Sequence, residues 1–81
     1  MIPQPEVTFR MNNDFLDGYN IFYLTVRVKL PNQSLPEVFG CRISIRSDIN
    51  YSTHFYESIL SRYLKQLFDI IKEETGLELA N

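Results

Sequence analysis

The sequence predicts an α+β fold in which a three-stranded antiparallel β-meander is covered on one face by a single long C-terminal amphipathic helix, in the order β-β-β-α. Two observations indicate this fold. Up to Ser47, three stretches alternate apolar and polar residues at the period of two that half-buried strands show. From about Ser52, apolar residues recur at the 3.6-residue period of a helix. The 81 residues suit a single domain, expected over 1–81.

The first two strands are predicted on either side of a tight turn. Alternation places the first strand over residues 6–12, and residues 13–18 are expected to form a loop. That loop ends in Asp17-Gly18, a frequent turn pair because glycine tolerates positive φ. The second strand, residues 19–30, is long and rich in β-branched residues, which favours the central position in the sheet.

The third strand is expected over residues 38–47, after a loop that is restricted by Pro31 and Pro36. Short connections favour neighbouring antiparallel strands, so the predicted strand order is 1-2-3. A helix of about 24 residues follows, long enough to overhang the sheet or cross it diagonally. Asn50 or Ser52 is expected to cap its start.

The end of the helix is predicted at Gly76, which suits the left-handed position there. The apolar face of the helix covers about half its circumference, more than three short strands need. Two explanations stay open. Either the loop residues Phe15, Leu16 and Leu35 cover the surplus, or it meets a partner or a second copy of the chain. Three aromatic residues mark the margin of this face as a partner or dimer contact: Tyr56, Tyr63 and Phe68.

The polar face of the predicted sheet is expected to carry only basic charges, although the net charge of the chain is −2. Alternation directs to it five of the eight lysines and arginines, with one tyrosine among them: Arg10, Arg27, Lys29, Arg42, Arg46 and Tyr23. The opposite face is almost purely apolar. This segregation of charge predicts a binding surface. The alternative of an ordinary solvated face, with Arg and Lys stems covering the pleated sheet, stays open.

No pattern of catalytic or metal-binding residues accompanies this face. A lone His54 provides too few ligands for zinc, and the carboxylates form no acid–base pair. The isolated glycines form no phosphate-binding loop. We therefore predict no enzyme, cofactor or metal. The single Cys41 is expected to be a small buried apolar residue in a reducing compartment.

The composition also bears on location. The chain begins without the pattern of a secretory signal and has no apolar run of about 20 residues, so a cytoplasmic location and no membrane contact are expected. The leading functional prediction is a non-enzymatic protein-binding module that occupies the surface of an unidentified protein partner. Inhibitors, adaptors and regulators act in this way, including accessory and anti-defence proteins of phages and mobile elements.

Two alternatives stay open. In the first alternative, the basic face binds nucleic acid, because arginine and lysine neutralise phosphates and Tyr23 can stack on a base. The predicted topology is similar to the AP2-type and integrase amino-terminal DNA-binding domains, whose sequence motifs the chain lacks. In the other alternative, the chain is a self-assembling subunit whose surplus apolar surface closes a homodimer.

Overall fold

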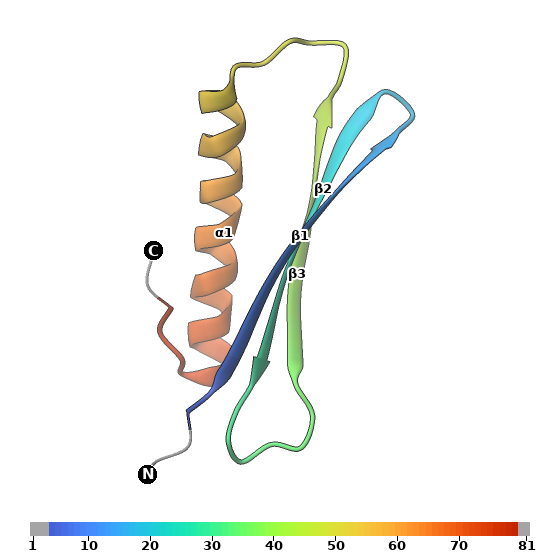
Figure 1. The fold of residues 1–81 in the computed structure, drawn as a ribbon. Coiled ribbons are helices and arrows are strands. Elements are labelled where there is room, and N and C mark those ends of the chain that lie inside the picture. Colours follow the sequence, from blue (N-terminus) through green and yellow to red (C-terminus); the bar gives the residue numbers. More distant parts are fainter. Residues whose placement is uncertain (1–3, 80–81) are drawn as a thin grey trace.

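The computed structural model describes residues 4–79 and confirms the predicted β-β-β-α architecture. Three antiparallel strands form an open sheet, and one helix follows them (Figure 1). The elements are β1 (Glu6–Leu16), β2 (Tyr19–Lys29), β3 (Glu37–Arg46) and α1 (Thr53–Thr75). The strand order is β1-β2-β3, so the predicted central position of β2 is confirmed.

The first strand is longer than alternation indicates. It continues to Leu16, so the loop predicted over residues 13–18 is wrong except for its last two residues. Asp17 and Gly18 have φ values of 52° and 80°, and positive φ at both positions matches a two-residue type I′ hairpin turn. The turn pairs Leu16 with Tyr19 and sets the register of the whole hairpin. Cross-strand pairing therefore overrides the low strand propensity of the Asn13–Asp14 segment.

The core lies between the sheet and α1. Its buried residues come from β2, β3 and the second half of the helix: Phe22, Leu24, Val26, Val28, Ile43, Ile45, Leu67 and Ile71. At the start of the helix, the ring of Tyr51 stacks on the ring of Phe55, with ring centroids 4.0 Å apart. The ring centroid of Tyr56 lies 6.0 Å from that of Phe22 on β2. These aromatic contacts tie the loop before α1 to the sheet.

Both predicted ends of the helix are confirmed. Ser52 caps α1, since its hydroxyl oxygen accepts a hydrogen bond from the Phe55 N–H at 3.2 Å. Gly76 adopts the left-handed conformation with φ 76°, and its N–H donates to the Lys72 carbonyl at 2.8 Å. Leu77 packs against the core, which is the apolar contact expected after such a cap.

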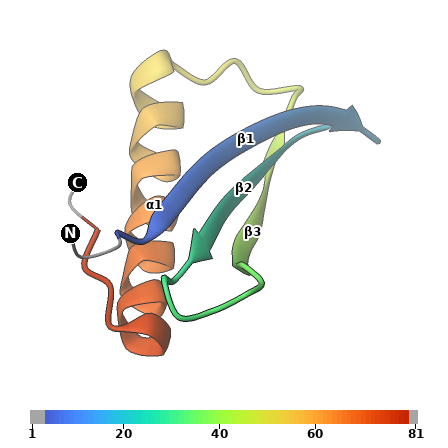
Figure 2. The ribbon, with the colours of Figure 1, turned by 60° about the horizontal axis from the view of Figure 1, so that its bottom comes forward.

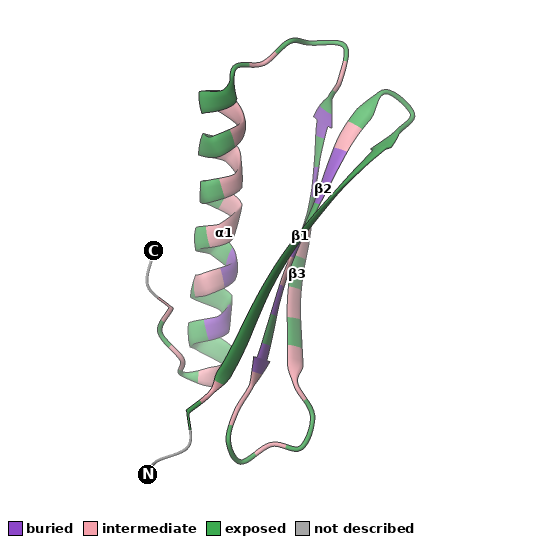
Figure 3. Cartoon of the chain, in the orientation of Figure 1, coloured by how far each residue is buried: buried purple, intermediate pink, exposed green. Residues whose placement is uncertain are grey.

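The helix leaves β1 uncovered. Backbone contacts between α1 and the sheet fall mainly on β3. From its N-terminal end, β1 diverges from the helix toward the hairpin turn (Figures 1 and 2). Every residue of β1 is exposed, and Figure 3 shows the strand green along its length. The expectation that loop residues cover the apolar surplus is wrong, because Phe15, Leu16 and Leu35 are 63%, 53% and 75% exposed.

The result is an elongated molecule. Its extents are 51 × 22 × 20 Å and its radius of gyration is 15.1 Å. A compact chain of this length would have a radius of gyration of about 12 Å. Within residues 4–79, no helix combines the length and the apolar composition that crossing a bilayer requires.

Candidate binding surfaces

The outer face of the sheet, which points away from α1, carries side chains in rows that cross all three strands. Moving away from the hairpin turn, three successive rows are Asn12–Tyr23–Arg42, Arg10–Thr25–Gly40 and Thr8–Arg27–Val38. Four of the predicted basic residues lie on these rows or the next, and we call them the basic cluster: Arg10, Arg27, Lys29 and Arg42.

Three members of the basic cluster are direct neighbours. Arg10 and Arg27 line one shallow hollow, and Arg27 and Lys29 line another beside it. Arg42 lies on β3, opposite Tyr23, which is 37% exposed. Among residues 4–79, no carboxylate forms an ion pair with any of the four. Their positive charge is therefore available to a ligand.

Arg46 belongs to a different part of the face. Its guanidinium forms a bidentate ion pair with Asp48, with the Nε–Oδ1 distance at 3.0 Å. This hydrogen bond to Asp48 raises the pKa of Arg46. Its position opposite Tyr19 is two rows beyond Arg42. We therefore separate Arg46 from the basic cluster, because a neighbour already neutralises its charge.

The expectation that only basic charges lie on the outer face is wrong. The register places Glu6 opposite Lys29 and Asp14 opposite Ile21, both on the outer side. Glu6 keeps the alternation of the first strand, and Asp14 joins the face because β1 continues past Asn12. The basic cluster is thus bordered by two carboxylates rather than standing on a uniformly positive face.

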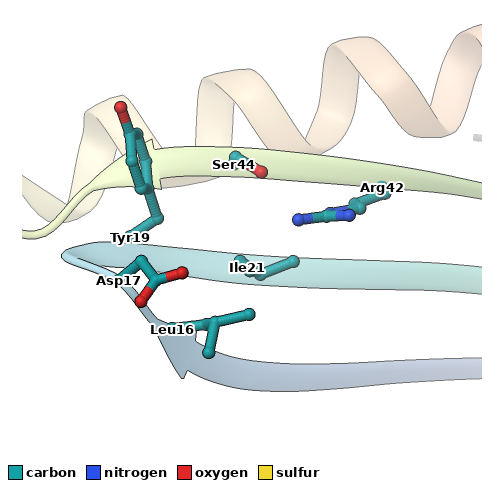
Figure 4. A pocket seen from close by; sticks show the side chains of 6 residues that line it. All are labelled: Leu16, Asp17, Tyr19, Ile21, Arg42 and Ser44. Carbon is teal, nitrogen blue, oxygen red and sulfur yellow. The ribbon is translucent and has the colours of Figure 1, made fainter.

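An apolar hollow adjoins the basic cluster near the hairpin turn. It encloses about 420 Å³ and is lined by Leu16, Asp17, Tyr19, Ile21, Arg42 and Ser44 (Figure 4). Ile21 lies on its floor and is only 2% exposed, although it points away from the main core. Leu16 and Tyr19 are 53% and 43% exposed. The hollow therefore offers an apolar surface beside an arginine.

The helix margin is less accessible than the sequence suggests. Tyr56, Tyr63 and Phe68 are half-buried and pack against the core. Phe68 also meets Phe9 of β1 edge to face, with ring centroids 6.4 Å apart. The broad apolar face of the helix is thus largely used within the chain itself.

A second surface, which the sequence analysis missed, lies along β1. Its side chains on the α1 side include four exposed apolar residues: Val7, Phe9, Met11 and Phe15, at 42%, 46%, 51% and 63% exposure. Strand and helix widths could have revealed it. Three strands that each take up about 4.8 Å make a sheet about 14 Å wide, whereas one helix is about 10 Å in diameter, so part of the sheet at one edge stays uncovered.

The described residues provide little chemistry beyond these surfaces. Within residues 4–79, no three His, Cys, Asp or Glu side chains gather in a way that could hold a metal ion. His54 is exposed at the start of α1. Cys41 is half-buried on the α1 side of β3, and this burial raises the pKa of its thiol. The arrangement suits binding through charge and apolar contact.

Comparisons of the chain with models of protein families, with curated proteins and with solved structures found no match.

Proposed function

We propose that the chain is a non-enzymatic binding module whose outer sheet face holds an acidic surface of a protein partner. One observation carries this proposal: an apolar hollow with a nearly buried isoleucine floor lies directly beside the basic cluster. Such a module acts by occupying its partner, as an inhibitor, adaptor or regulator does. We place this activity in the cytoplasm.

The chemistry of the face favours a protein over nucleic acid. Protein interfaces concentrate their energy in arginine and tyrosine anchors around a pocket that takes an apolar side chain. Arg42 and Tyr19 line such a hollow here, and Tyr23 stands opposite Arg42. Asp14 and Glu6 interrupt the positive charge of this face, which disfavours an unbroken row of phosphates, whereas the separate carboxylates of a protein can lie beside the basic cluster alone. A partner segment with an apolar residue flanked by carboxylates would meet both features.

A display library of random dodecapeptides, selected on the immobilised full chain, tests this proposal. We expect enrichment of peptides that combine Asp or Glu with a large apolar residue. Titration calorimetry with the best peptide then compares variants. Arg42→Glu should weaken binding at least about tenfold, because it reverses the charge beside the hollow. Arg62→Glu is the matched control, since Arg62 is an exposed arginine on α1 and should leave the affinity unchanged.

Two outcomes would contradict the proposal. One is the absence of any acidic, apolar consensus. The other is a selected peptide that binds the Arg42→Glu variant as tightly as the original chain.

Nucleic acid is the second candidate, supported by the basic cluster and the exposed Tyr23. An oligothymidylate of 20 nucleotides provides the probe. Four phosphate contacts on a single strand predict that the logarithm of the association constant falls with the logarithm of the salt concentration with a slope of about −3. Measurable binding with that slope, lost in an Arg27→Glu variant, would favour this candidate. The absence of binding at low salt would exclude it.

A further inference from the structure

The free edge of β1 has a defined set of unpaired backbone groups. Antiparallel strands alternate between residue pairs that exchange hydrogen bonds and pairs that do not. The two-residue turn makes Leu16 and Tyr19 a bonded pair, so the even-numbered residues of β1 direct their N–H and C=O groups to β2. The odd-numbered residues direct theirs to the open edge: Val7, Phe9, Met11, Asn13 and Phe15. The Phe15 N–H already donates to Asp14 Oδ1 at 2.8 Å, so the unpaired N–H groups of this edge are those of Val7, Phe9, Met11 and Asn13.

The same odd-numbered residues carry the exposed apolar side chains. Val7, Phe9, Met11 and Phe15 point to the α1 side of the sheet, where each is at least 42% exposed although Phe9 also touches Phe68 of the helix. A long, apolar, unprotected edge strand is a template for pairing with another strand. Natural edge strands are normally shortened or protected by charged side chains, especially lysine, by proline or by a bulge. β1 extends over 11 residues without lysine or proline, and its register shows no bulge. Its three charged residues, Glu6, Arg10 and Asp14, all lie on the outer face and leave the α1 side apolar apart from Asn13.

The chain exposes more surface than a compact monomer of its mass, by an amount similar to one side of a protein interface. The chain exposes 6143 Å². A monomer of 9.6 kDa is expected to expose about 5,100 Å². The excess of about 1,000 Å² per chain compares with about 800 Å² per partner in a standard interface.

The charges of β1 are arranged for a second copy of itself. Arg10 and Asp14 lie at equal distances on either side of Asn12, all on the outer face. In an antiparallel pair of β1 strands centred on Asn12, each Arg10 stands opposite the second copy's Asp14. Phe9 then stands opposite the second copy's Phe15 on the α1 side. Opposite charges and aromatic pairs stabilise cross-strand positions.

Other registers are less favourable. Centring the pair on Arg10 places the two arginines opposite each other, and like charges in that position destabilise the pairing. Centring it on Met11 places Arg10 opposite asparagine and leaves Asp14 opposite threonine. Centring it on Thr8 also places Arg10 opposite a carboxylate, that of Glu6, but pairs only residues 6–10 of β1. The register centred on Asn12 combines opposite charges with a longer pairing, over residues 8–16, and is self-complementary, as a two-fold interface requires.

From this geometry we propose that the chain forms a symmetric homodimer in which two β1 strands pair antiparallel about Asn12, making one continuous six-stranded sheet. The two helices lie on the same side of that sheet, flanking the paired apolar residues of β1. On the opposite side of the sheet, the outer faces of the two copies form one continuous surface. This inference does not rest on the proposed function, because the hollow and most of the basic cluster lie away from the edge.

Sedimentation equilibrium of the full chain between about 1 and 500 μM tests the dimer and its register. We compare the original chain with Arg10→Asp, Asp14→Arg and the variant that carries both changes. The original chain should have the mass of a dimer. Each single change should raise the dissociation constant at least about tenfold, because it replaces two attractive pairs with two repulsive ones. The double variant should return to within about threefold of the original.

The double variant is the control for folding, since it contains both substitutions yet restores the charge pairing. Three results would overturn the proposal: a monomer mass of 9.6 kDa over the whole range, single variants that associate as well as the original, or a double variant as weak as the singles. The first of these leaves the outer-face peptide test unaffected.

Discussion

Phe9 of β1 and Phe68 of α1 meet edge to face, with ring centroids 6.4 Å apart and ring planes at 77°. Among the aromatic pairs of residues 4–79, this one joins the uncovered strand to the helix. The contact lies toward the N-terminal end of β1 and the C-terminal half of α1. Toward the turn, the strand diverges from the helix (Figure 2). The two rings thus anchor one end of an otherwise exposed strand.

Replacing Phe68 with alanine should therefore lower the free energy of unfolding by about 2 kcal/mol, roughly half the cost for a fully buried phenylalanine. The reason is the combined loss of core packing and of the contact with Phe9. Urea denaturation monitored by circular dichroism measures the change. Leu35→Ala, at a residue that is 75% exposed, serves as the control and should change stability by less than about 0.5 kcal/mol. Equal effects of the two substitutions would refute the anchoring role.

Ile70 and Ile71 offer a matched test of the core, because they are adjacent on α1 yet differ in burial. Ile71 is 0% exposed and Ile70 is 46% exposed. Ile71→Ala should cost about 3 kcal/mol, whereas Ile70→Ala should cost less than about 1 kcal/mol. Because a chain of this size has little stability to spare, Ile71→Ala is expected to be largely unfolded at 37 °C. Thermal unfolding of both variants checks the orientation of the helix, and the reverse ranking would show that orientation to be wrong.

Cys41 should react slowly in the folded chain. Burial raises the pKa of its thiol above the ordinary value of 9.0, so less of the reactive thiolate is present at pH 8. Alkylation by iodoacetamide, followed by mass spectrometry, should be at least about tenfold slower in the native chain than in guanidinium chloride.

The sign of the corresponding pH effect follows from the same shift. The folded chain holds the thiol proton more tightly than the unfolded chain, so the native state gains stability below pH 9.0. That contribution disappears as pH rises from 9.0 through the folded pKa. Equal alkylation rates in the two states at pH 8 would contradict the burial of Cys41.

A proline scan tests the alternation of backbone hydrogen bonds along β1. The N–H of Asn13 points to the open edge, whereas the N–H of Asn12 points to β2. Asn13→Pro should therefore preserve the fold of the monomer and block pairing between copies, because proline lacks the donor at the edge. Asn12→Pro should instead disrupt the β1–β2 hairpin and destabilise the chain by about 3 kcal/mol or more.

Circular dichroism and sedimentation of the two proline variants give the readout. The assignment of edge-facing groups would be wrong if Asn13→Pro unfolded the chain while Asn12→Pro left it intact.

The fold could be predicted because local signals agree with it. Alternation identified β2 and β3 to within one residue, and Ser52 and Gly76 marked both ends of the helix. The extension of β1 to Leu16 was not predicted, because the Asn13–Asp14 segment has little strand propensity of its own. Its conformation is imposed by pairing with β2, which a single strand's composition does not show.

The candidate surfaces were predictable only in part. Alternation placed Arg27, Lys29 and Arg42 on one face, and the register brings them into neighbouring rows. The neutralisation of Arg46 depends on the chain's bend toward Asp48, a contact between side chains that periodicity does not report. The exposure of β1 was not predicted, because the sequence shows the period of the helix but not which strands the helix covers.

Residue-resolved amide hydrogen exchange on the full chain tests most directly whether the edge of β1 is completed by a second copy. At concentrations well above the dissociation constant, the N–H groups of Phe9, Met11 and Asn13 should be protected. Those of Arg10, Asn12 and Asp14 bond to β2 and should be protected in either state, which makes them internal controls. Dilution, or Arg10→Asp, should release the first set alone. If these three edge-facing amides exchange freely at 500 μM while the controls stay protected, the edge is open and the homodimer does not form.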